Sequence, residues 1–122
     1  DISRLHAIVQ KDQSNLKSGK DDAKTDADFH VTIAAMTHNT IFSHIMASCY
    51  HLLWNTQRVS RDKMFRKREN RKLIAQQHWK IFEAIRDKDS HRAGKEAANH
   101  IDFVESQLRE VIRSKEDPPR KT

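Results

Sequence analysis

Three histidines, His30, His78 and His100, occupy positions where the hydrophobic pattern predicts apolar side chains. Each is spaced three or four residues from apolar neighbours, so its imidazole should lie on the inner face of an amphipathic helix. Asp26 precedes His30 by four residues, which places both side chains on one helix face about one turn apart. Burying this carboxylate without a compensating charge would be costly. We therefore predict that the four residues, from three helices, converge on one divalent metal ion.

The donor set indicates which ions would bind. Imidazole and carboxylate ligands suit zinc, nickel, manganese or iron better than calcium, which prefers an all-oxygen shell; we expect zinc, with nickel or manganese as alternatives. Three neutral imidazoles, one carboxylate and a divalent cation leave a single positive charge, which attracts anions in a low-dielectric cavity. A small carboxylate with an adjacent hydroxyl or keto oxygen would fit open coordination positions. Further donors to such an effector are expected from Thr37, Asn39 and Arg61.

Two other interpretations of these histidines remain open. A core histidine commonly bonds a carbonyl or hydroxyl group, so the chain would then be a helical interaction module with structural histidines. A metal-dependent hydrolase would need a general base beside an open coordination position. The sequence contains no HExxH motif, and the nearest candidates, Glu83 and Glu96, fall on outward or marginal positions. We expect that the protein is not an enzyme.

Composition and periodicity predict one all-α domain over 1–115. Charged residues make up 33% of the chain, with only two glycines and two prolines, which favours long amphipathic helices. Helices are predicted over about 2–17, 21–38, 41–59, 69–88 and 90–115, with a polar tail at 116–122. Expected helix-end residues are Gly19, Asn39 or Thr40, and Asp89 or Ser90.

The most apolar predicted helix, 41–59, has the character of a central helix or a subunit interface. We expect its lone Cys49 to be a small core residue, and a single cysteine fits a reducing cytoplasm. No apolar run is long enough to span a membrane. The net charge is +6, with basic residues concentrated at 58–72. A solvated loop and helix entrance accounts for them, so direct nucleic-acid binding by this chain alone is a minor hypothesis.

Two groups of motifs resemble a known family. The segments 26–30 (DADFH) and 33–39 (IAAMTHN) resemble the first signature of the FCD domain, the effector-binding C-terminal domain of FadR-type GntR transcription regulators. The segment 78–85 (HWKIFEAI), with Asp89, Ala93 and His100, resembles its second signature. His78 and His100 are 22 residues apart, as the family's third and fourth metal ligands are.

This resemblance implies an antiparallel helical bundle and a metal bound by Asp26, His30, His78 and His100. It also implies a homodimer in which a carboxylate effector changes the placement of two winged helix-turn-helix domains, and thereby operator affinity. The segment 100–109 is similar to members that sense lactate, glycolate or pyruvate. The DNA-binding domain and the family's first FCD helix are expected to be missing from this chain.

Overall fold

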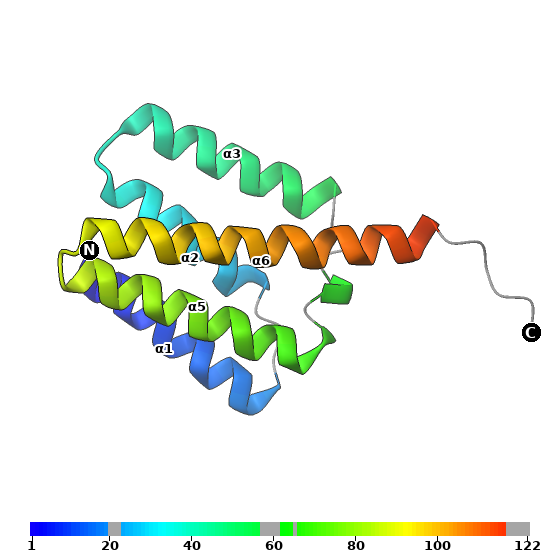
Figure 1. Ribbon diagram of the computed structural model, residues 1–122. Helices are drawn as coiled ribbons and strands as arrows, with labels where there is room; N and C mark the ends of the chain where they lie inside the picture. Colours follow the sequence, from blue (N-terminus) through cyan, green and yellow to red (C-terminus); the bar gives the residue numbers. More distant parts are fainter. Residues whose placement is uncertain (20–22, 57–61, 65, 117–122) are drawn as a thin grey trace, which may run out of the picture.

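A computed structural model of the chain describes residues 1–19, 23–56, 62–64 and 66–116. These residues are almost entirely helical and contain no strand, which confirms the predicted all-α class. The helices are α1 (Ile2–Ser18), α2 (Ala23–Met36), α3 (Thr40–Thr56), α5 (Arg68–Arg86) and α6 (Ser90–Glu116) (Figure 1). The predicted helix ends agree to within about two residues wherever the chain is described. Residues 57–59, the end of the predicted third helix, and 117–122 of the predicted tail lie outside the described residues.

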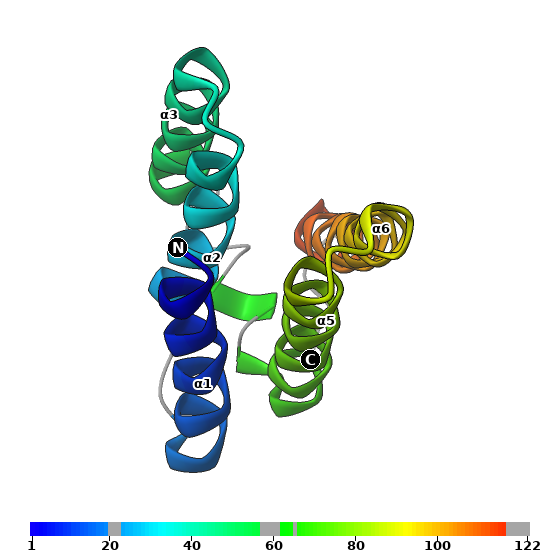
Figure 2. The ribbon, with the colours of Figure 1, turned by 90° about the vertical axis from the view of Figure 1, so that its left-hand side faces the viewer.

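The helices form two layers. α1, α2 and α3 lie side by side in one layer, and α5 and α6 form the other (Figure 2). Successive helices run in opposite directions (Figure 1), so the bundle is antiparallel. α1 packs on both α2 and α5, which joins the layers at one edge, while α3 packs mainly on α2. The predicted ligands therefore come from facing layers, with two on α2, one on α5 and one on α6.

A tight turn sets the antiparallel pairing of α5 and α6. Lys88 adopts a left-handed conformation with φ of 56°, and its N–H donates to the Ile85 carbonyl at 3.1 Å while the Asp89 N–H donates to Ala84 at 2.9 Å. This pattern closes the end of α5. The Asp89 carboxylate then accepts a hydrogen bond from the Arg92 N–H at 3.0 Å. Asp89 is therefore the N-cap of α6, one of the two residues predicted for that role.

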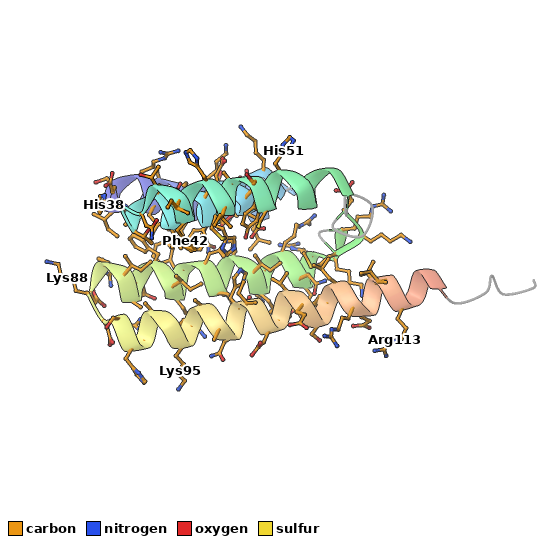
Figure 3. The ribbon with its side chains drawn as sticks, turned by 90° about the horizontal axis from the view of Figure 1, so that it is seen from above. His38, Phe42, His51, Lys88, Lys95 and Arg113 are labelled. Atoms are coloured by element: carbon orange, nitrogen blue, oxygen red, sulfur yellow. The ribbon has the colours of Figure 1, made fainter. Side chains whose placement is uncertain are left out.

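The turn between α2 and α3 is built in the same way. His38 is left-handed, with φ of 58°, and the Asn39 side-chain oxygen accepts from the Phe42 N–H at 3.1 Å. This confirms the predicted cap at Asn39. His38 and Lys88 lie at the same end of the molecule (Figure 3), so both layers turn back at that end.

The main apolar core lies between α1, α2 and α5. Its fully buried members are Leu5, Val9, Phe29, Ile81 and Phe82. A second cluster forms where Met64 and Ile74 meet the half-buried apolar side chains of α6. The two clusters fix how α2, α5 and α6 face one another, and thereby the relative positions of the histidines.

α3 is not the central helix of this chain. Ile41 and Ile45 are 73% and 55% exposed, and Cys49 is exposed rather than buried in the core as predicted. An apolar helix face indicates burial but does not say by what. The described residues leave this face uncovered, so of the two alternatives the central position is wrong. No helix within the described ranges is both long and apolar enough to cross a bilayer.

Replacing Asp89 by alanine should lower the free energy of unfolding by about 1 kcal/mol, because the Arg92 N–H loses its acceptor at the start of α6. Chemical denaturation followed by circular dichroism measures the change. Asp102→Ala, an exposed change inside the same helix, is the matched control. Equal stabilities of the two variants would contradict the capping role.

Candidate metal centre

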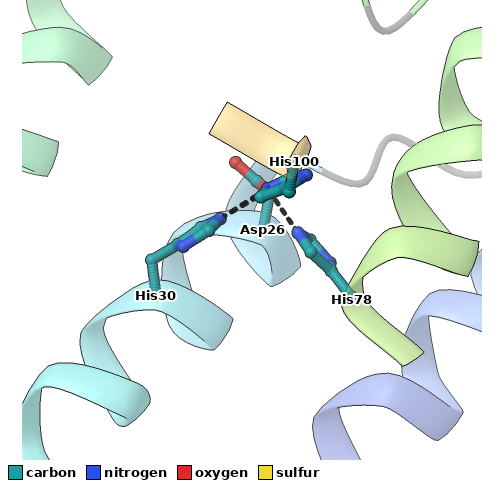
Figure 4. Close-up of side chains that lie close together, drawn as sticks. All are labelled: Asp26, His30, His78 and His100. Carbon is teal, nitrogen blue, oxygen red and sulfur yellow. Dashed lines mark hydrogen bonds and ion pairs between the residues drawn. The ribbon is translucent and has the colours of Figure 1, made fainter. Parts of the chain in front are cut away.

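Asp26, His30, His78 and His100 meet at one point between the two layers (Figure 4). Each offers one ligand atom, and the four atoms lie within 4.8 Å of one another. The His30 and His78 Nε2 atoms lie 3.5 and 3.0 Å from Asp26 Oδ1. The His30 and His100 Nε2 atoms are 3.1 Å apart. The structure thus brings together all four residues that the sequence analysis assigned to a metal.

These separations suit donors around one small cation. Zinc–nitrogen bonds of about 2.0–2.1 Å in a tetrahedral site place neighbouring ligand atoms about 3.3 Å apart. The contacts of 3.0, 3.1 and 3.5 Å lie on either side of that value. Calcium would instead need six to eight oxygen ligands, which the three imidazoles do not supply.

The Nδ1 atom of His78, on the side of the ring away from Asp26, contacts a residue that the sequence analysis did not identify. Asp12, on α1, places Oδ2 2.8 Å from His78 Nδ1, and the two residues are only 2% and 0% exposed. The Phe29 ring stacks on the imidazole at a centroid distance of 4.1 Å. The sequence did contain a signal, because Asp12 falls three residues after Val9 and seven after Leu5 on the apolar face of α1.

His100 is held in a similar way. Its Nδ1 lies 2.6 Å from the side-chain oxygen of Gln77, the residue that precedes His78. Because an amide oxygen only accepts hydrogen bonds, the Nδ1 atom carries the proton and Nε2 presents its lone pair to the centre. Sequence periodicity gave no reason to connect these side chains.

The imidazole of His30 is stacked between two other rings. It stacks on His100 at a centroid distance of 5.0 Å and on Tyr50 of α3 at 5.4 Å. Burial, followed by the nearby charge of Asp26, raises the pKa of Tyr50 above its ordinary value. The hydroxyl therefore stays protonated at neutral pH and can donate a hydrogen bond beside the site.

An unpartnered atom shows that the site fits a cation. His78 Nε2 is completely buried and has no hydrogen-bond partner among the described residues, although Asp26 Oδ1 is 3.0 Å away. A neutral His78 that donates from Nδ1 to Asp12 turns a lone pair on Nε2 toward the Asp26 oxygen. Two acceptors at that distance need a positive charge between them, which either a proton on Nε2 or a divalent metal ion supplies.

The pKa shifts also point to one concentrated positive charge. Burial by itself would lower the pKa of His78, but the contacts with Asp12 and Asp26 outweigh it and raise the pKa to about 9. Burial would raise the pKa of Asp26, yet the His30 and His78 rings hold it well below its ordinary value. Burial, followed by the charges of His78 and His30, lowers the pKa of His100 to about 3. The shifts thus favour positive charge at His78, between the two carboxylates, over positive charge at His100.

Asp12 changes the charge assigned to the site. The sequence analysis gave a loaded centre one net positive charge because it counted one carboxylate. With the second buried carboxylate in contact with His78, a divalent cation and neutral imidazoles bring the total to zero. An anionic ligand would therefore be held by open coordination positions and nearby donors rather than by a residual charge.

The residues predicted to contact an effector lie elsewhere or are not described. The Thr37 hydroxyl donates to the Ala34 carbonyl at 2.6 Å, and Asn39 caps α3. Both side chains are exposed, in the turn at the end of α2, and neither belongs to the cluster of four ligands. Arg61 lies outside the described residues. Their contact with an effector stays a prediction.

Comparison with known proteins connects this geometry to a family. The FCD domain model matches residues 1–103. The chain is 26% identical over 89 residues to the Glc operon transcriptional activator of Escherichia coli (strain K12), which covers 73% of this chain and 35% of that protein. It is 25% identical over 119 residues to the Uxu operon regulator of Haemophilus influenzae, which covers 97% of this chain and 44% of that protein. No solved structure gave a significant match.

The chain spans less than half of the length of these curated relatives. The family match covers most of this chain, however, and includes all four residues gathered at the centre. The resemblance found in the motifs around His30 and His78 is thereby confirmed. The chain belongs to the FCD domain family.

Proposed function

We propose that this chain is the metal-binding, effector-sensing domain of a bacterial GntR-type transcription regulator of the FadR subfamily. The convergence of Asp26, His30, His78 and His100 on one point carries the proposal. The partners of the outer ring nitrogens support it, because Asp12 and Gln77 turn two of the Nε2 lone pairs inward. The curated relatives named above are an operon activator and an operon regulator.

In this proposal the four side chains hold a divalent transition metal, zinc first and nickel or manganese as alternatives. The bound ion supplies a Lewis-acidic anchor for an oxygen ligand. The surrounding residues orient the imidazoles and exclude water: Phe29 covers His78, and Tyr50 covers His30. The role that we propose for the centre is therefore ligand binding and not catalysis.

The effector that we propose is a small carboxylate with an adjacent hydroxyl or keto oxygen, such as lactate, glycolate or pyruvate. Two neighbouring oxygens allow chelation at open coordination positions, which is needed because the centre has no surplus charge. Thr37, Asn39 and Arg61 remain candidates for further contacts. The protonated hydroxyl of Tyr50 is a stronger candidate than these three residues, because the Tyr50 ring stacks on His30 at the centre.

Control of DNA binding would follow from a shift between two arrangements of a homodimer. An effector that binds one arrangement more tightly shifts the population toward it, and winged helix-turn-helix domains outside this sequence would respond through operator affinity. Burial in an interface between subunits would suit the exposed Ile41 and Ile45 of α3. Such a regulator would work in the cytoplasm.

The rival proposal, a metal-dependent hydrolase, would need a general base at the centre, and the described residues place neither Glu83 nor Glu96 there. Glu83 lies 3.7 Å from Arg86 in an ion pair on α5 and lines a hollow with Gln13 and Trp79, outside the ligand cluster. Glu96 is not a member of the cluster either. Among the described residues, the carboxylates in the cluster or touching it are Asp26 and Asp12, and both are engaged by histidines.

Metal binding should be lost in His78→Ala and His100→Ala, because each removes an inward-facing ligand. Metal analysis of purified protein should show about one ion per wild-type chain and little in either variant. Chelation should lower the melting temperature of the wild type but not of the variants, since a ligand at 100 times its Kd stabilises a fold by about 2.7 kcal/mol. His44→Ala, at an exposed position on α3, should behave as wild type. A wild-type chain that neither contains metal nor responds to zinc would contradict the proposal.

Effector binding should depend on the metal. In a thermal-shift screen of hydroxy and keto acids, at least one acid should raise the melting temperature of the metal-loaded protein and have a far smaller effect on the chelated protein. Monocarboxylates without the second oxygen should shift it less. If every acid leaves both forms unchanged, the proposed effector class is wrong, whereas the metal proposal is judged by the previous experiment.

A further inference from the structure

We propose that Asp12 is a positioning residue of the metal centre that also sets its net charge, so that the centre holds its cation more tightly and an added anion more weakly. This inference rests on the metal-binding function proposed above. The carboxylate is not one of the four residues whose ligand atoms converge, and it acts through His78. Its helix, α1, supplies no ligand to the cluster.

The geometry assigns the positioning role. Asp12 Oδ2 lies 2.8 Å from His78 Nδ1, in a contact that spans 66 residues of sequence. A carboxylate can only accept, so the imidazole donates from Nδ1 and keeps its lone pair on Nε2. Nε2 is the atom that faces Asp26. Without Asp12, the ring could take the other tautomer or rotate, and the centre would lose a correctly directed ligand.

Packing on α1 holds the carboxylate in place. Asp12 lies on the buried face of the helix, three residues after Val9 and three before Asn15. Asn15 donates to the Thr25 hydroxyl at 3.2 Å in a buried link to α2. α1 is therefore attached to α2 next to Asp12, and the ring of His78 is fixed between the carboxylate and Phe29.

His100 shows that orientation alone does not require a charge. Its Nδ1 is held at 2.6 Å by the neutral Gln77 side chain, while His78 is held by a carboxylate that is only 2% exposed. A buried carboxylate is destabilising unless an opposite charge lies close by. In the metal-loaded centre, where the imidazoles are neutral, that opposite charge is the cation, so Asp12 should strengthen its retention. The same negative charge repels an anionic ligand that binds to the ion.

Asp12→Asn tests the proposal because it keeps the size of the side chain and an oxygen acceptor but removes the charge. Zinc affinity, measured by competition with a chromogenic chelator, should fall by about 10- to 100-fold, as is typical when the partner of a metal-binding histidine is lost. Asp28→Asn is the matched control, since it makes the same change at an exposed position of α2 between the two ligands of that helix, and it should leave zinc affinity unchanged.

A second measurement separates this role from a structural one. Wild type and variant are saturated with Co²⁺ and titrated with acetate, and coordination is followed in the visible spectrum. Asp12→Asn should bind acetate more tightly than wild type, although it binds metal more weakly. Asp12→Glu keeps the charge but moves it by one methylene, so it should weaken zinc binding and leave acetate affinity close to that of wild type. It also provides a variant should Asp12→Asn fail to fold.

Two outcomes would overturn the inference while the proposed function stands. In the first, wild type binds zinc and Asp12→Asn binds it equally well. In the second, the Asp12 variants melt at a lower temperature in both the chelated and the loaded form, with unchanged zinc and acetate affinities, which is the behaviour of a purely structural residue. A wild type that binds no zinc overturns the proposed function itself, and the inference with it.

Discussion

A buried and a half-buried carboxylate on either side of one imidazole are the constraint that the rest of this bundle must satisfy. Asp12 and Asp26 approach opposite nitrogens of His78, at 2.8 and 3.0 Å. Neither acid is tolerable in an apolar interior unless positive charge lies close to it. The apolar core of α1, α2 and α5 reaches this group through Phe29, which stacks on the His78 ring. Binding of a cation by these side chains would therefore be linked to folding, because they lie where α1, α2 and α5 meet.

The sequence predicts contacts between residues that are close along the chain better than contacts between residues that are far apart along it. The members of the cluster were predictable because each is placed by local periodicity: His30 follows Asp26 by one turn, and His78 and His100 replace apolar residues on inner faces. The caps at Asn39 and Asp89 are local as well. That the separate helix faces meet at one point was inferred from the cost of burying the Asp26 carboxylate, and the motifs of the FCD family implied the same four residues.

The features that were missed depend on tertiary placement. Nothing near Asp12 in the sequence indicates that its partner lies 66 residues away, and the Gln77–His100 contact depends on the rotation of two helices. The burial of Cys49 was predicted from the apolar face of α3, but none of the residues that the structure describes covers that face. A hydrophobic pattern indicates that a helix face tends to be buried, but it does not identify the element or subunit that covers that face.

The length of α6 has a mechanical consequence. His100 lies near the middle of this helix, which extends past the ends of its neighbours (Figure 1). A helix rises about 1.5 Å per residue, so the arm from His100 to Glu116 is about 24 Å long. A tilt of about 5° with its pivot at the imidazole would displace the far end of such an arm by about 2 Å. The cluster thus lies near the pivot of this arm, so a small change in the tilt of α6 at His100 is amplified into a displacement of about 2 Å at Glu116.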